Sequence, residues 1–128
     1  MAIRVVRLGT PRTAGEGLRL GTVRRPPRGV PKAEHASRDF YDVWLPDLAP
    51  SESLVKEALH ASDEQTWRRF AKRYRTEMKR PEAARLLALL AALSHQTNFS
   101  VGCYCAEEAR CHRSILKALL REHGANLV

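Results

Sequence analysis

The sequence contains no long hydrophobic segment. It has 128 residues, and its longest nearly uncharged apolar run covers positions 86–93. That run is far shorter than the ~20 residues needed to span a bilayer. The first residues, Met-Ala-Ile-Arg, also lack the apolar core of a secretory signal peptide. We therefore expect a soluble, cytoplasmic protein with no membrane partner.

Cysteine is scarce. The sequence has three cysteines, all between positions 103 and 111. An odd, clustered set does not form the paired disulfide framework of a small secreted protein. Isolated structural cysteines behave as small buried hydrophobic residues and have no reason to cluster. The three cysteines therefore predict a functional site in a protein of a reducing compartment.

Acidic residues are nearly missing from the first quarter of the chain. Residues 1–32 contain eight basic residues and one acid, Glu16, for a net charge of +7, whereas residues 33–128 carry +1. Such a segment attracts phosphates or polyanions, although it is also compatible with a merely solvated surface. Tyrosine and phenylalanine do not alternate with these arginines, as a single-strand stacking platform requires. This lack makes nucleic acid the weaker of the two ligand interpretations.

The pattern of apolar and turn-forming residues predicts an α/β fold. We expect short strands near residues 2–8, 18–23, 40–45 and 99–105. We expect helices near residues 51–60, 62–78, 81–93 and 111–123. Strands separated by helices indicate a short, mainly parallel sheet flanked by helices. At this length the chain fits a single domain, residues 1–128.

Two of the expected helices carry distinct apolar patterns. An aromatic and methionine stripe, which we assign to the core, comprises Trp67, Phe70, Tyr74 and Met78. Between positions 83 and 93 only Arg85 is polar, so this helix is expected to be buried on most sides or to cover a partner. The chain is therefore expected to be a monomer or a homodimer.

The strongest chemical signal is the segment C-Y-C-x5-C-H-R, formed by Cys103, Cys105, Cys111, His112 and Arg113. It follows a predicted strand and opens the next helix, which is where open α/β sheets bind ligands. A helix N-terminus and an arginine favour an anion and lower the pKa of a nearby thiol. The segment predicts Cys105 or Cys111 as nucleophile, His112 as proton-transfer partner and Arg113 as an anion clamp.

Other residues complete the predicted site. The basic loop at residues 24–28 closes an anion pocket, for a small anionic or nucleotide-like ligand, if it folds back over the strand ends. Its candidate anion-binding residues are Arg24, Arg25 and Arg28. Possible supporting residues are Asp42, Tyr74 and Cys103. No cofactor is expected, and whether the protein is an enzyme stays open.

Three alternatives compete with this interpretation. A nucleic-acid accessory protein would use Arg4 together with the arginines of the basic loop. The site would hold no ligand if Arg113 pairs with Glu107, Glu108 or Asp42. The three thiols would be inert if they pack beneath the last helix, where burial raises the pKa of a thiol.

Zinc is a further alternative, because three cysteines and His112 would complete a tetrahedral shell. The spacing argues against it. In a strand, the Cα atoms of Cys103 and Cys105 would lie about 6.6 Å apart, whereas two sulfurs on one zinc ion approach within ~4 Å. We therefore expect no metal. A C-x5-R phosphatase loop is also missing, since Ala109 and Cys111 stand where the arginine would be.

Four separated motifs resemble one known family. These motifs are C-Y-C-x5-C-H-R-S-I-L, Pro27-Arg28-Gly29, Asp42-Val43-Trp44-Leu45 before Ala49-Pro50-Ser51, and Phe70-x3-Tyr74 followed by Met78. In this order they resemble the domain of unknown function 488 (DUF488) family, including its YeaO-like branch. The resemblance covers nearly the whole chain. It implies a small cytoplasmic α/β domain of bacteria or archaea and names no biochemical activity.

Overall fold

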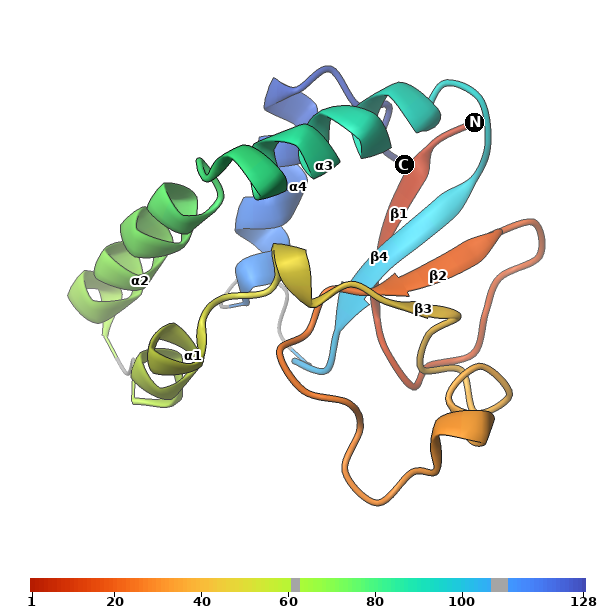
Figure 1. The fold of residues 1–128 in the computed structure, drawn as a ribbon, viewed down its shortest axis with the longest axis horizontal. Helices are drawn as coiled ribbons and strands as arrows, with labels where there is room; N and C mark the ends of the chain where they lie inside the picture. The colour runs from red at the N-terminus through yellow and green to blue at the C-terminus, as the bar shows by residue number, and fades with distance from the viewer. Residues whose placement is uncertain (61–62, 107–110) are drawn as a thin grey trace.

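A computed structural model describes residues 1–60, 63–106 and 111–128 (Figure 1). Its strands are β1 (Ile3–Arg7), β2 (Leu18–Gly21), β3 (Val43–Trp44) and β4 (Phe99–Cys103). Its α-helices are α1 (Glu52–Leu59), α2 (Glu64–Glu77), α3 (Pro81–Leu93) and α4 (His112–Glu122). Two short 3-10 helices are η1 (Lys32–Glu34) and η2 (Pro46–Leu48).

The four strands form one parallel sheet in the order β1-β4-β2-β3. The central strand β4 pairs with β1 from Ile3↔Phe99 to Arg7↔Cys103, and with β2 from Leu18↔Phe99 onward. All pairings are parallel because each strand returns to the sheet through a crossover connection. The predicted α/β class with a short parallel sheet is confirmed.

The helices divide into two pairs. Helices α3 and α4 pack together and lie close to the strands, whereas α1 and α2 form a second pair farther from the sheet (Figure 1). Val101 of β4, Leu87 of α3 and Leu116 of α4 belong to the same buried core. In α2 the predicted stripe is confirmed, since Phe70, Tyr74 and Met78 are buried and Trp67 packs against them.

Helix α3 is only partly covered. Ala83, Leu87 and Leu90 are buried, but Leu89 is 53% and Leu93 is 39% exposed. The expected coverage on most sides is therefore wrong within the described structure. A partner for the outer face stays a prediction. Among the described residues, no helix combines the length and apolar character needed to cross a membrane.

The third strand is shorter than expected. The sequence predicted extended chain over residues 40–45, but β3 covers only Val43–Trp44. Asp39 has a positive φ of 63°, and the Phe40 amide donates to the His35 carbonyl, so the chain is still turning at residue 40. Pro46 then begins η2. These two constraints leave room for a two-residue strand.

Strand β4 also ends earlier than expected, and this matters for the site. It stops at Cys103, Tyr104 lies in a bend, and Cys105 has no regular structure. The assumption that Cys103 and Cys105 share a strand is therefore wrong. Without it, the Cα separation of about 6.6 Å no longer applies. The argument against a shared metal ion loses its basis.

A buried ion pair between Glu16 and Arg19 lies on the face of the sheet opposite to the core residue Val101. The side chains of Glu16 and Arg19 are 2% and 1% exposed, and Arg19 Nε lies 2.8 Å from Glu16 Oε2. The Ser100 hydroxyl donates to the same carboxylate at 2.8 Å. Burial by itself would raise the pKa of Glu16, but the hydrogen bonds from Arg19 and Ser100 outweigh it and lower the pKa to about 2.

This pKa predicts an acid-sensitive component of stability. The ordinary value is 4.5, so the unfolded chain binds the proton more readily between pH 4.5 and 2. The ion pair therefore contributes fully above pH 4.5, and about 3 kcal/mol is lost as the pH falls toward 2. Urea unfolding of the wild type and of Glu16→Gln across this range measures the component. A wild-type profile parallel to that of Glu16→Gln would contradict it.

Candidate functional site

The candidate site lies where β4 ends and α4 begins. Cys103 is the last residue of β4, and Cys111 is the N-cap residue of α4. Side chains alternate along a strand, so Cys103 shares the face of the core residues Phe99 and Val101. The strand end and the helix start thus bring the first and last cysteines of the motif together.

Two of the three thiols are buried and in direct contact. Cys103 and Cys111 are each 2% exposed, and their Sγ atoms lie 2.7 Å apart. Cys105 is exposed, and its thiol interacts electrostatically with both of the others. No disulfide joins them, since all three cysteines are free. The structure therefore brings the sulfurs of Cys103 and Cys111 into contact, with the exposed Cys105 beside them in the sequence.

The ionisation of these thiols is unequal. Interaction with Cys103 and Cys111 lowers the pKa of Cys105. Interaction with the other two thiols, together with burial, raises the pKa of Cys103. A negative charge in this group is therefore favoured on the exposed Cys105 over the buried Cys103.

His112 is held in one orientation. Its Nε2 lies 2.7 Å from the carbonyl oxygen of Thr22, and its Nδ1 lies 3.8 Å from Cys111 Sγ. A carbonyl oxygen only accepts, so Nε2 carries the hydrogen and the lone pair of Nδ1 faces the sulfurs. The Tyr74 ring packs edge-on at 5.5 Å. Burial lowers the pKa of His112 to about 4, which keeps the ring neutral.

These side chains have the arrangement of a metal-ligand set. Cys103, Cys111 and His112 are buried, and one ligand atom from each lies within 4.8 Å of the other two. Thiolate sulfur and imidazole nitrogen are the usual ligands of zinc. A histidine that binds zinc commonly donates its other N–H to a carbonyl oxygen, as His112 does to Thr22.

Arg113 is buried beside Cys105. It is 3% exposed, and its terminal Nη2 donates to the Cys105 carbonyl oxygen at 2.6 Å. Its buried Nε has no hydrogen-bond partner among the described residues. Asp42, one of the acids expected to pair with Arg113, binds Arg12 instead. The other two, Glu107 and Glu108, lie outside the described residues.

The basic loop does fold back toward this site. The Tyr104 hydroxyl donates to the Arg25 carbonyl at 2.9 Å. The guanidinium groups, however, have other partners. Arg24 Nε donates to the Pro50 carbonyl at 2.9 Å, Arg25 pairs with Glu52, and Arg28 is exposed. An anion-binding role for these arginines stays a prediction.

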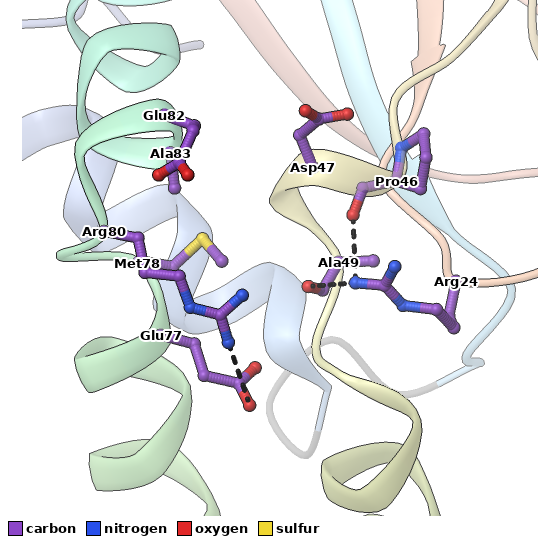
Figure 2. Close-up of a pocket in the computed structure, with 9 residues that line it drawn as sticks. All are labelled: Arg24, Pro46, Asp47, Ala49, Glu77, Met78, Arg80, Glu82 and Ala83. Atoms are coloured by element: carbon purple, nitrogen blue, oxygen red, sulfur yellow. Dashed lines mark hydrogen bonds and ion pairs between the residues drawn. The ribbon is translucent and has the colours of Figure 1, made fainter.

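Figure 2 shows where Arg24 lies. Its terminal Nη2 donates to the carbonyls of Pro46 and Ala49, each at 3.2 Å, at the wall of a cavity of about 270 Å³. Glu77 and Arg80 form the opposite wall (Figure 2). None of the residues lining this cavity belongs to the cysteine segment. Arg24 therefore ties the loop to η2.

The remaining predicted residues, Tyr74 and Asp42, lie in different places. Tyr74 lies at the site, whereas Asp42 lies in the loop around β2. Tyr74 contacts His112, as described above, and its hydroxyl donates to the Leu48 carbonyl at 2.6 Å. Asp42 accepts from Arg12 and from the backbone amide of Arg19, so it orders the loop around β2. The sequence analysis did not identify Thr22, because a backbone carbonyl carries no residue-type signal.

A family model described as Active DUF488-N3 subclade matches residues 3–124. The chain belongs to the DUF488 family. The resemblance of its motifs to this family is thereby confirmed, whereas the YeaO-like branch stays a prediction. Comparison of this DUF488 protein with curated proteins and with solved structures gave no match in either case. The description of the matching DUF488 subclade names no ligand and no reaction.

Proposed function

We propose that this DUF488 protein binds a zinc ion through Cys103, Cys111 and His112, with Cys105 as the fourth ligand. The observation that carries the proposal is the convergence of three buried ligand atoms within 4.8 Å. The exposed Cys105 is the third cysteine of the segment, and its thiol interacts electrostatically with the other two. Three sulfurs and one imidazole nitrogen give the tetrahedral shell that zinc favours.

The present distances require a small adjustment on metal binding. Two sulfurs bound to one zinc ion at ~2.3 Å lie roughly 3.7 Å apart, whereas those of Cys103 and Cys111 are 2.7 Å apart. The two sulfurs would therefore have to separate by about 1 Å. The ring of His112 needs no rearrangement, because Thr22 already fixes its tautomer.

Zinc content and zinc affinity test this proposal. The chain, purified with a reducing agent, should contain about one zinc ion, as a four-ligand site predicts. Cys111→Ser and His112→Ala should each lose it. His123→Ala is the matched control, since His123 is an exposed histidine at the far end of α4. Metal-free wild type that binds no zinc in a competition titration would overturn the proposal, as would an equal loss in His123→Ala.

A second candidate is thiol-dependent chemistry on an anionic ligand. It is favoured by the exposure of Cys105 beside the buried Arg113, whose Nε has no partner in the part of the chain that the structure describes. In this case Arg113 binds the anionic group, which places the ligand beside the exposed thiol of Cys105 as nucleophile, with His112 as the proton-transfer partner. Alkylation of the same samples separates the two. Zinc ligation protects all three cysteines until a chelator is added, whereas a free nucleophile leaves Cys105 rapidly labelled without chelator. Slow labelling of metal-free protein would contradict the second candidate.

A further inference from the structure

A second cavity lies beside the edge strand β1 and shares no residue with the cysteine segment. Its volume is about 300 Å³, and its walls come from β1, the following loop, β2 and α4. Ligand pockets start at roughly this volume. The cavity therefore suits a small molecule.

Most of the charged side chains that line this cavity are basic. They are Arg4, Arg7, Arg19 and Lys117, and the one acidic side chain is Glu16. That carboxylate is already neutralised, because Arg19 binds both of its oxygens at 2.8 and 3.0 Å. Counting side chains, the cavity carries a charge of +3, and Glu16 offers little repulsion to an incoming anion.

The register of the sheet explains how Arg4 reaches this cavity. Both Arg4 and Arg19 are paired with Ser100, so the three residues form a row across β1, β4 and β2. Residues paired in this way point to the same face. The Ser100 hydroxyl donates to Glu16, so the base of the row is a fixed hydrogen-bonded network. Arg4 ends the row at the sheet edge, and its side chain has no hydrogen bond or ion pair with any residue the structure describes.

Arg7 is also positioned in advance. Its Nε donates to the Tyr104 carbonyl at 3.2 Å, which anchors the side chain and leaves the two terminal nitrogens of the guanidinium for a ligand. An anchored guanidinium loses less side-chain entropy on binding than a free one. The two terminal nitrogens of Arg7 can donate two parallel hydrogen bonds to phosphate oxygens.

We infer that this cavity binds a small molecule bearing a phosphate group. The positive charge of the lining favours a phosphate dianion, and the forked guanidinium of Arg4 suits its oxygens. The concave shape favours a phosphorylated small molecule over a nucleic-acid strand, which needs an open track along its backbone. This site is separate from the proposed zinc site and does not depend on it.

Calorimetric titration of the full chain with pyrophosphate and with adenosine 5′-monophosphate tests the inference. Saturable binding of at least one probe is expected. Arg4→Gln and Arg7→Gln should each weaken it by about tenfold, the usual loss for a charge-assisted hydrogen bond. Arg85→Gln on α3 is the matched control and should change the affinity less than twofold, because Arg85 does not line the cavity.

Three further measurements make the outcome decisive. Thermal unfolding must show that Arg4→Gln is as stable as the wild type, so that lost binding reports the ligand contact. Cys105→Ser should bind the probes normally, which distinguishes failure here from failure of the zinc proposal. A single-stranded oligonucleotide that binds more tightly than both probes, and is weakened equally by Arg4→Gln and Arg28→Gln, would overturn the inference. The inference would also be overturned if neither pyrophosphate nor adenosine 5′-monophosphate binds.

Discussion

Arg19→Met is expected to lower the free energy of unfolding by about 3–5 kcal/mol, because it leaves the charge of Glu16 buried without its partner. Arg19 is fully buried and donates to Glu16 and to the carbonyls of Thr10 and Asp39. Methionine is similar in length but supplies none of these donors. Equilibrium unfolding in urea, followed by circular dichroism, measures the change.

Two companion variants identify the cause. Arg12→Met removes ion pairs to Asp39 and Asp42, but the Arg12 side chain is 26% exposed, so the loss should stay near 1 kcal/mol. Adding Glu16→Gln to Arg19→Met should recover part of the lost stability, since no uncompensated charge remains buried. An effect of Arg19→Met no larger than that of Arg12→Met would contradict the explanation.

Zinc removal is expected to lower the Tm of the protein by roughly 10–15 °C. A metal ion that binds only the folded state adds about 4 kcal/mol when its concentration is a thousand times Kd, and 1 kcal/mol corresponds to roughly 2–4 °C or slightly more for a chain of this size. The proposed zinc ligands lie at the end of β4 and at the start of α4, so a bound ion would join these two elements. The Thr22 carbonyl connects His112 to the segment after β2. Calorimetric scans with and without a chelator measure the shift.

Cys111→Ser provides the control for this shift. It removes one ligand, so its Tm should be the same with and without the chelator. A wild-type Tm that does not respond to chelator, or a Cys111→Ser variant that responds equally, would be inconsistent with a bound metal ion. Comparison under reducing conditions is essential, because two thiols as close as those of Cys103 and Cys111 are well placed to oxidise to a disulfide.

The arginines that give the first quarter of the chain its positive charge have different structural roles. Arg19 is buried in an ion pair, Arg12 binds Asp42, and Arg24 donates to backbone carbonyls of the η2 region. Arg4 and Arg7 line the cavity beside β1, and neither has an ion pair with a described residue. A net charge counts all of these arginines alike, so it could not separate the structural ones from those available to a ligand.

The candidate site was predicted in outline from local sequence. The spacing of Cys103, Cys111 and His112 placed them at a strand end and a helix start, and the structure has them there. The prediction was wrong for Cys105, which was expected to continue the strand. A two-residue extension of the strand would have held it away from Cys103, but the chain bends at Tyr104 instead. Strand ends are set by pairing with neighbouring strands, and β1 pairs with β4 only as far as Arg7↔Cys103.

The sequence by itself determined the elements whose signals are local. Ser51 caps α1 through its hydroxyl, and Pro81 occupies the first turn of α3, because capping and proline geometry depend on neighbours within a few residues. Only the tertiary structure decided which distant groups meet. The Thr22 carbonyl reaches His112 across 90 positions, and Ser100 reaches Glu16 across 84. Such contacts follow from strand order and register, which arise from packing of the whole chain and leave no periodic pattern in the sequence.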